Sequence, residues 1–414
     1  MRRVFIFATF GFLILGNFKI KSAPIKVEQD SKVINLDEAF KKNKKINLSD
    51  IADSVTFLPL ETNKNILVQK PNFYFSTNYI YYQSNYFDWT GRFIGKIGII
   101  GNGTYEEPEG IYNILYKDNH FYSKATKFIE YDINGMPTGK VKNIYTDKEY
   151  DNVRGLKEFF ITGENFAVYS YPSTIYFFDK DFKISASRKV VNEYSSFPFI
   201  NSIVNATYIS YYNESVLFYN FVNDTIFSVT EKELEPRWIV RFNNELRLSN
   251  DCILRYPELM NKVIGLIEGK QSSVSIENAE LIKLTDNKHM VWAVYETNQY
   301  VFFIMSEMTF LSEFRKKKTP TGYVVYFDKK TRETIRVDGR GFIDDMTGME
   351  FFFPKLGGYD EKLMASIWPY ELIEYIEKCK KEGRKINPRL LELSRTIKED
   401  DNPILIFVHL KKEK

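Results

Sequence analysis

The feature that most constrains the fold is a short unit that recurs along the middle of the chain. Each copy has an aromatic strand, a turn at Asp or Asn, and a second strand. Asp, Asn and Gly tolerate positive φ and bond their own backbone, so the chain reverses at these turns and forms β-hairpins. The copies cover residues 86–97, 130–141, 176–184, 219–227 and 325–337.

The spacing of the copies predicts how the hairpins assemble. They lie about 40 to 50 residues apart, with one wider gap between the fourth and the fifth, and this period is typical of the blades of a β-propeller. A blade gains stability by stacking on its neighbours, because it has two faces to cover. Roughly 300 residues at this period give about six blades. Two β-sandwiches are the alternative.

The two ends of the repeat region predict how such a ring closes. An early strand at 54–60 and a final strand at 403–410 could share one blade, which would remove exposed strand edges. Helix start and stop signals follow Pro369 and Asn387. We therefore expect an all-β, six-bladed β-propeller over 46–411, with a small helical insertion at about 361–399 before the C-terminal closing strand.

The N-terminus resembles an export signal. Arg2 and Arg3 precede an apolar stretch at 4–16 that is too short to span a bilayer. We interpret residues 1–23 as a signal peptide or signal anchor and residues 24–45 as a linker. No later apolar run has membrane-spanning length, so an exported protein of the periplasm or cell envelope is predicted, with no further transmembrane domain.

Composition narrows the function classes. The chain has 414 residues, and its net charge of +3 comes from bases interspersed with acids, which argues against nucleic acid as a partner. The 16% aromatic content favours sheet. The two cysteines, Cys252 and Cys379, exclude a disulfide-built fold and a cysteine zinc site, and their spacing leaves open whether they pair.

Motifs for catalysis are absent from the sequence. The three histidines, at 120, 289 and 409, have no metal-ligand spacing, and no nucleophile elbow or P-loop occurs. The glycines at 98, 101 and 103 are best interpreted as a crossover between blades, because the acidic residues after them would repel phosphate. We predict no catalytic residue and no metal ligand, and a non-enzymatic role is favoured.

Two acidic clusters and one tryptophan remain as candidates for ligand binding. Carboxylates at 106, 107 and 109 and at 344 and 345 could hold Ca²⁺ near a propeller channel, but they lack the spacing of a calcium loop and solvated turns are favoured. Trp89 lies in a predicted turn and could stack on a ligand, although packing is favoured. The candidate residues are Trp89, Glu109, Asp344 and Asp345.

Three segments carry a resemblance to a known family: 46–62, which contains Pro59-Leu-Glu-Thr62, then 87–108, and 401–411. They resemble the entry strand, the blade turn with its glycine-rich loop, and the closing strand of a six-bladed β-propeller family of Bacteroidetes related to NHL-type propellers. The resemblance implies a fold and an exported location, without a reaction. Many relatives look like lipoproteins, whereas Asn17 stands where the lipidated Cys would be.

Three functional hypotheses follow. The first is a binding module whose partner is a glycan or an envelope protein. The second is a propeller enzyme, such as a Ca²⁺-dependent lactonase or a lyase, which predicts convergent polar side chains at the channel mouth. The third is an architectural scaffold, which predicts a large apolar patch and no polar pocket.

Overall fold

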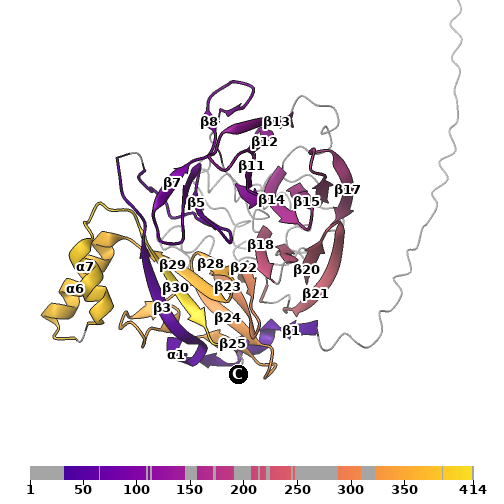
Figure 1. Cartoon of the computed structure of the whole chain (residues 1–414). Helices are drawn as coiled ribbons and strands as arrows, with labels where there is room; N and C mark the ends of the chain where they lie inside the picture. The colour runs from indigo at the N-terminus through magenta and orange to yellow at the C-terminus, as the bar shows by residue number, and fades with distance from the viewer. Residues whose placement is uncertain are drawn as a thin grey trace, which may run out of the picture.

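The structure is a computed structural model that describes residues 32–64, 66–108, 111, 114–144, 156–170, 174–190, 207–212, 215–220, 224–243, 246–247, 288–308, 322–384 and 386–412. Six blades of antiparallel strands form a closed ring, which confirms the predicted propeller (Figure 1). One edge strand of each blade lies innermost, so six such strands surround the central channel.

The blades follow one another around the ring. Blade 1 has β4 (Tyr74–Phe75), β5 (Ile80–Tyr82), β6 (Asn85–Phe87) and β7 (Phe93–Lys96); blade 2 has β10 (Leu115–Lys117), β11 (His120–Lys124), β12 (Lys127–Tyr131) and β13 (Pro137–Asn143); blade 3 has β14 (Leu156–Thr162), β15 (Asn165–Ser170), β16 (Thr174–Phe178) and β17 (Ile184–Lys189). Blade 4 has β18 (Thr207–Tyr212), β19 (Ser215–Asn220), β20 (Thr225–Thr230) and β21 (Glu233–Arg241); blade 5 has β22 (Lys288–Glu296), β23 (Tyr300–Met308), β24 (Gly322–Asp328) and β25 (Thr334–Val337); blade 6 has β28 (Gly357–Tyr359), β29 (Lys362–Ile367), β30 (Ile404–Leu410) and β3 (Ala52–Pro59). The innermost strands around the channel are β4, β10, β14, β18, β22 and β28.

Blade 6 closes the ring with both ends of the chain. The early strand β3 pairs antiparallel with the final strand β30, from Ala52 opposite Leu410 to Pro59 opposite Ile404. This pairing is the closure that the sequence predicted. The hydrogen bonds between β3 and β30 join the first and last parts of the propeller. Neither strand therefore has an unpaired edge on the side where the two meet.

The turns between the third and fourth strands repeat one local structure. In blade 2 the Asp132 carboxylate accepts from the amides of Asn134 (2.9 Å) and Met136 (2.8 Å), and Gly135 has φ +78°. Asp88, Asp179 and Asp328 cap the equivalent turns of blades 1, 3 and 5. A short acceptor side chain at this position satisfies amides that the reversal leaves free, so the aspartate recurs with the blade.

One of the five predicted repeat copies belongs to a different hairpin. The copy at 219–227 includes the end of β19, at Asn220, and the start of β20, at Thr225, which are the second and third strands of blade 4. The turn equivalent to those at Asp88 and Asp132 lies at Glu231, between β20 and β21, and has no capping aspartate. Glu231 takes the positive φ there, at +45°. The sequence pattern therefore identified a hairpin of blade 4, but not the one formed by the third and fourth strands, as in the other copies.

The segment predicted as a linker, 24–45, contains regular structure from Val33 onward, which corrects that expectation. β1 (Val33–Asn35) pairs in parallel with β21 of blade 4, and β2 (Asn43–Lys44) pairs in parallel with β25 of blade 5. Between them lies the short helix η2 (Leu36–Phe40), and α1 (Leu48–Ile51) leads into β3. We call residues 33–51 the N-terminal strap, because they join the outer edges of three successive blades.

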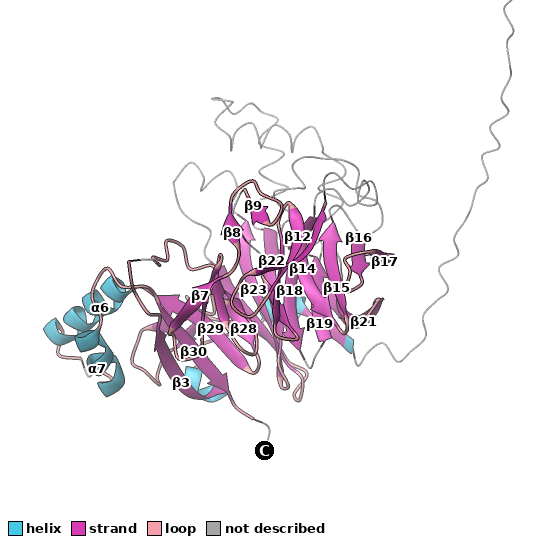
Figure 2. Ribbon diagram, turned by 45° about the horizontal axis from the view of Figure 1, so that its top comes forward, coloured by secondary structure: helices cyan, strands magenta, loops and turns pink. Residues whose placement is uncertain are grey.

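The helical insertion lies beside the ring (Figure 2). It has α6 (Pro369–Lys381) and α7 (Pro388–Thr396), with prolines in both first turns, and it separates β29 from β30. Its start is later than predicted, because residues 362–367 form β29 and pair with β30. Cys379 is buried on α6, and Cys252 lies outside the described residues.

The remaining short strands connect these elements. β8 (Ile99–Ile100) and β9 (Glu106–Glu107) lie between blades 1 and 2, so the glycine-rich segment is a crossover between blades as predicted. β26 (Phe342–Ile343) and β27 (Phe351–Phe352) form a hairpin between blades 5 and 6. Buried Phe, Tyr, Ile and Val side chains fill the spaces between neighbouring blades, and this is the stacking that a propeller needs for stability.

Candidate functional site

A cavity of about 720 Å³ lies at one end of the central channel. It is formed around the turns between the first and second strands of the blades, which we call the A–B turns, and we call this end the channel mouth. Its lining combines aromatic, aliphatic and charged side chains. The lining residues are Phe75, Ser76, Thr77, Tyr81, Trp89, Ile114, Leu115, Tyr116, Ile161, Tyr211, Tyr212, Glu296, Tyr359, Asp360, Glu361 and Lys362.

A second cavity, of about 290 Å³, lies along the innermost strands. It shares Phe75, Leu115 and Tyr359 with the mouth, so the two cavities meet along one wall. The deeper cavity also contacts Phe159, Tyr208 and Met364, and its lining is mainly apolar. None of its described lining residues is charged, and the described charged side chains of the two cavities all line the mouth.

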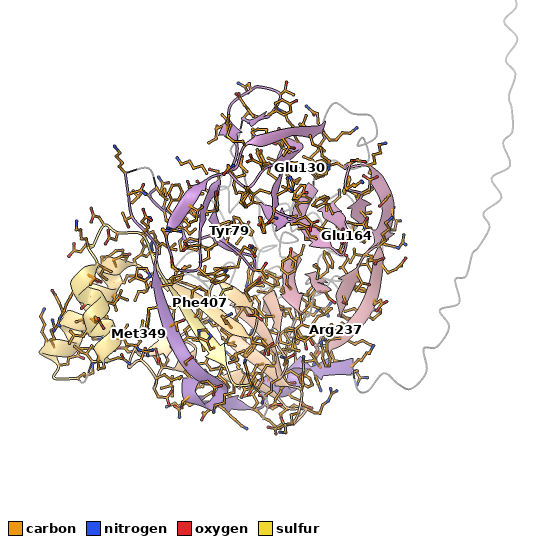
Figure 3. The ribbon with its side chains drawn as sticks, in the orientation of Figure 1. Tyr79, Glu130, Glu164, Arg237, Met349 and Phe407 are labelled. Carbon is orange, nitrogen blue, oxygen red and sulfur yellow. The ribbon has the colours of Figure 1, made fainter. Side chains whose placement is uncertain are left out.

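One wall of the mouth is an aromatic surface built from blades 1 and 6. Trp89 stacks against Tyr359 with ring centroids 6.0 Å apart and against Phe75 at 6.1 Å. Phe407 of β30 packs against the same tryptophan at 5.6 Å; Figure 3 labels Phe407 within blade 6. The Trp89 indole N–H donates to the carbonyls of Ser76 (3.2 Å) and Thr77 (3.0 Å), which fixes the ring over the first A–B turn.

The sequence placed Trp89 correctly in a turn, the one between β6 and β7. Both interpretations of this residue have support in its surroundings. Its ring packs among other aromatic side chains, and it also lines the cavity while only half-buried. Its role in ligand binding stays a prediction.

A buried charge cluster lies behind the opposite wall. The Glu296 side chain is 0% exposed and accepts from the Arg237 guanidinium at 2.5 and 2.9 Å and from the Trp238 indole at 3.0 Å. The Lys329 ammonium lies 2.6 Å from the other side of the same carboxylate. Arg237 comes from blade 4 (Figure 3), whereas Glu296 and Lys329 come from blade 5, so the cluster joins two blades.

Tyr212 covers this cluster on the side of the cavity. Its ring is contacted by the Arg237 guanidinium, 4.8 Å from the centroid, and by the Lys329 ammonium at 4.6 Å. Burial lowers the pKa of Lys329 below its usual range, and the Glu296 carboxylate opposes that shift. The two cations are therefore already engaged by Glu296 and by the ring of Tyr212.

The A–B turn of blade 6 carries the most exposed charges of the mouth. Asp360 and Glu361 are the two central residues, with φ of +44° and +50°, between the paired residues Tyr359 and Lys362. The Lys362 ammonium binds the Asp360 carboxylate at 3.0 Å. The Glu361 carboxylate accepts from the Asn298 amide at 2.9 Å. Burial raises the pKa of Glu361, and the neighbouring Asp360 and Glu296 act in the same direction.

Asp344 and Asp345 do not line either cavity. Asp344 is buried and accepts from the amides of Met346 (3.2 Å) and Thr347 (2.8 Å), and burial raises its pKa. Asp345 accepts from the Ser49 amide at 3.0 Å and so fixes α1. Both carboxylates act as caps for the backbone, and their role as ligand-binding residues has no support in this arrangement.

The other acidic candidates also lie near backbone amides. Glu109 is outside the described residues. Glu107 is 0% exposed and accepts from the Thr126 hydroxyl at 2.6 Å and from the Lys127 amide at 3.0 Å. Glu106 accepts from the amide of Gly103 at 2.8 Å, so it stabilises the crossover loop. Within the described parts of the chain, no group of three or more His, Cys, Asp and Glu is placed to hold a metal ion.

The three histidines lie far from one another in the fold. His289 is buried on β22, and its ring bonds the Tyr323 hydroxyl at 2.9 Å. Burial lowers its pKa to about 4. His409 is on the closing strand beside Thr56, at 3.0 Å, and His120 bonds the Asp118 carbonyl at 2.8 Å. Each has a local structural partner.

The charged residues of the mouth were not among the sequence candidates. Asp360 and Glu361 follow Tyr359 in an aromatic-Asp pattern like that of the repeat unit, and this signal could have marked them as a turn of a blade. Glu296 and Arg237 are 59 positions apart, and no local pattern connects them. None of the helices in the described residues has the length and apolar character needed to cross a bilayer.

Comparison with solved structures shows one extensive likeness. A Bacteroides fragilis protein named as a candidate exported protein superposes with a TM-score of 0.63 at 18% identity, covering 92% of this chain and 99% of that one. A protein of unknown function from Bacteroides caccae gives a TM-score of 0.31 at 10% identity, over 63% of this chain and 77% of that one. BamB from Moraxella catarrhalis gives 0.28 at 10% identity, over 68% and 75%.

The first of these supports the six-bladed propeller fold and, at its identity, nothing finer. No curated protein matches the chain significantly. The relation to NHL-type propellers stays a prediction. A family model described as a domain of unknown function, DUF4934, matches residues 31–409, and the chain therefore belongs to this family.

Proposed function

We propose that this protein is an exported binding module that holds a carbohydrate in the channel mouth. The observation that carries the proposal is the cavity of about 720 Å³, whose lining combines aromatic and charged side chains. Its volume is within the range of small-molecule sites, roughly 300 to 1,000 Å³. An aromatic ring can cover the apolar face of a sugar while its hydroxyl groups bond to carboxylates and lysine.

The shape of the site favours a glycan over a protein partner. A stable protein interface buries a total of about 1,200 to 2,000 Å², mostly on broad surfaces. Here Trp89 and Tyr359 line a concave space, together with Tyr116 from the next blade. A single sugar chain can enter such a space, and the mixed lining is also a reason to disfavour a purely architectural scaffold.

Export is supported by the sequence and by the fold comparison. Arg2, Arg3 and the apolar stretch at 4–16 have the order of a signal segment. The Bacteroides fragilis structure that shares this fold is named as a candidate exported protein. We therefore place the binding module in the periplasm or on the cell envelope. Fractionation of cells that express the full chain tests this part of the proposal.

Calorimetric titration of the purified protein with a panel of soluble oligosaccharides tests the binding function. We expect one class to bind, and Trp89→Ala to weaken that binding roughly tenfold or more, because a large ring surface is lost. Tyr370→Ala is the matched control, since Tyr370 is an exposed aromatic of α6. Trp89→Phe keeps a ring in the wall and separates the loss of stacking from a loss of folding.

Two additions to the same titrations separate the alternatives. We expect chelation of divalent cations to leave binding unchanged, whereas a Ca²⁺-dependent enzyme would lose its substrate or its turnover. Chromatography of the recovered sugars detects cleavage, which would make the protein a propeller enzyme. Absence of binding across the panel would contradict the proposal, and capture of an envelope protein at the mouth would support the other candidate partner.

A further inference from the structure

The A–B turn of blade 6 has an unusual backbone for its sequence. A two-residue turn with positive φ at both central positions normally contains Asn-Gly or Asp-Gly, because glycine has no Cβ to clash. Here the second position is Glu361, at φ +50°. A left-handed backbone is strained for a residue other than Gly, Asn or Asp, so the fold would be more stable with glycine at this position.

The strained residue Glu361 also lines the cavity, next to Tyr359 and Lys362. Its backbone carbonyl accepts from the Leu410 amide at 3.0 Å, and its carboxylate accepts from the Asn298 amide at 2.9 Å. These two bonds hold the residue between the closing strand of blade 6 and the A–B turn of blade 5. The position of the carboxylate is thereby fixed before any ligand arrives.

The charges around Glu361 define what it can receive. Among the described residues, Lys362 is paired with Asp360, and both Arg237 and Lys329 are paired with Glu296. Glu361 takes part in no ion pair within the described residues, and its hydrogen bond with the Asn298 amide uses the Oε1 atom. Its Oε2 atom can therefore accept a hydrogen bond from a ligand.

The donor that suits this oxygen is a neutral hydroxyl group. Lys362 is the basic side chain among the described lining residues, and Arg237 and Lys329 lie next to the lining residue Glu296, so a cationic ligand would meet these three groups. An anionic ligand would meet Asp360 and Glu361 at the rim. When the two cations next to Glu296 are counted, three acidic and three basic side chains balance at the mouth and favour neither class. A neutral hydroxyl group avoids both repulsions, and its hydrogen bond to a carboxylate is stronger than one between two neutral groups.

Resting on the proposed carbohydrate function, we propose that Glu361 is the specificity-determining residue of the mouth and selects neutral, polyhydroxylated sugars. The strained turn holds its carboxylate over the space beside the Trp89–Tyr359 wall, where the Oε2 atom accepts a sugar hydroxyl group. Glycine would suit the backbone at position 361 better, but it would not place a carboxylate at the mouth.

The test compares charged and neutral hexasaccharides by calorimetry. The neutral probes are maltohexaose, cellohexaose, xylohexaose and chitohexaose; the charged probes are the hexamers of galacturonate and glucosamine. We expect a neutral probe to bind most tightly. With that probe we expect Glu361→Gly to bind about tenfold or more weakly, because a charge-assisted hydrogen bond is lost, and Glu361→Gln to bind more weakly by a smaller factor.

Stability and ligand affinity are expected to change in opposite directions in this experiment. Glu361→Gly removes the backbone strain, so its melting temperature should be equal to or above that of the wild type while its affinity falls. Gln83→Gly is the matched control, because Gln83 also has positive φ (+51°), in an exposed turn that does not line the mouth. We expect it to raise the melting temperature by about 1 to 3 °C and to leave affinity unchanged.

A pH profile provides a readout that a merely structural role would not move. Because the carboxylate is the acceptor, affinity of the wild type should fall as the pH is lowered through the raised pKa of Glu361. Asp360, Glu296, Lys329, Arg237 and Lys362 face the same turn, so the informative quantity is the difference between wild type and Glu361→Gln. That difference should vanish at low pH.

The outcomes are distinct for the two proposals. If no hexasaccharide binds the wild type, the carbohydrate function itself fails. If a probe binds and Glu361→Gly has unchanged affinity, the site remains a sugar site and the role of Glu361 is wrong. Tightest binding of the galacturonate or glucosamine hexamer would likewise overturn the selection of neutral sugars.

Discussion

Removing the Glu296 carboxylate tests the electrostatic reasoning most directly. Glu296 is fully buried and accepts hydrogen bonds from Arg237 and Trp238, while Lys329 lies 2.6 Å away. The side chains of the two cations are 31% and 18% exposed. In Glu296→Ala both cations lose their carboxylate in a partly desolvated place. We expect the free energy of unfolding to fall by about 3 to 5 kcal/mol, as for a broken buried ion pair.

Urea unfolding followed by tryptophan fluorescence measures this loss. With an m-value of about 3 kcal/mol/M, a loss of about 4 kcal/mol lowers the midpoint by roughly 1.3 M. Glu233→Ala is the matched control on β21. Glu233 pairs with Arg188 at 2.5 Å, but the two side chains are 64% and 36% exposed. An exposed pair contributes about 1 kcal/mol or less, so this variant should unfold close to the wild type.

A double variant identifies the source of the loss. When Arg237→Ala is combined with Glu296→Ala, the charge left unpaired by the single change is partly removed. The combined loss should therefore be smaller than the sum of the two single losses. Equal midpoints for Glu296→Ala and Glu233→Ala would refute the reasoning, because they would mean that burial adds nothing to the interaction of Glu296.

Three further substitutions test what stabilises the propeller. Asn402→Ala should lower the free energy of unfolding in urea by about 2 to 4 kcal/mol. The buried Asn402 side chain accepts from the Val68 amide (2.8 Å) and donates to the carbonyls of Glu61 (2.8 Å) and Ile66 (3.3 Å). Asn134→Ala, in an exposed turn, is its control. Gly91→Ala should lose more stability than Gly139→Ala, since both have positive φ but only the Gly91 Cβ would meet a carbonyl, that of Pro59 at 2.2 Å. The pKa of His289 in the folded protein is lowered to about 4, so between about pH 6.5 and 4 the unfolded chain binds the proton more readily. The free energy of unfolding should therefore fall by up to about 3 kcal/mol as the pH is lowered through this range. His289→Gln should flatten that slope, and an unchanged slope would contradict the assignment.

The fold was largely predictable because its signals are local. Asp88, Asp132, Asp179 and Asp328 each cap a turn within four residues of themselves, so the pattern needs no knowledge of the rest of the ring. The turn at Glu231 lacks this cap, and blade 4 was therefore marked by another of its hairpins. The two strands β3 and β30 could be matched because both are apolar and lie at the ends of the repeat region.

The N-terminal strap shows where local signals fail. Residues 41–45 are four lysines and an asparagine, all exposed, and the two-residue strand β2 among them has no alternation to detect. Its pairing with β25 uses backbone atoms, which any side chains permit. Ile34, Leu36 and Ala39 of the strap are buried in the core, and the ring of Phe40 lies 4.5 Å from that of His289. Such a contact across about 250 positions has no signature in either segment.

The channel mouth was only partly predictable for a related reason. Trp89 could be named because it lies in a recognisable turn, whereas its partners Tyr359 and Phe407 come from the other end of the chain. Asp344 and Asp345 looked like a site because two carboxylates are adjacent. In the fold they cap the backbone around α1 and the β26–β27 turn. Adjacency of two acids therefore does not by itself indicate a site, because Asp360 and Glu361 are also adjacent and line the channel mouth.

Ring closure and the proposed site depend on the same contacts, which leads to a last prediction. Phe407 of β30 supports Trp89, and the Leu410 amide bonds the Glu361 carbonyl. A ligand held by Trp89 and Glu361 therefore binds only the closed ring. At a ligand concentration of about 100 times Kd, closure is stabilised by about 2.7 kcal/mol, which corresponds to roughly 100-fold slower amide exchange where opening of blade 6 controls it.

Hydrogen exchange with and without the tightest-binding hexasaccharide measures this coupling. Amides of β30 and β3 should slow most, since they exchange when the closing strand separates. Those of β16 in blade 3 are the internal control, because no residue of that strand lines the mouth. Equal slowing in β30 and β16 would mean that the ring opens as one unit. Slowing confined to the A–B turns would mean that the ligand binds without reinforcing closure, and the link between Glu361 and the closing strand would be wrong.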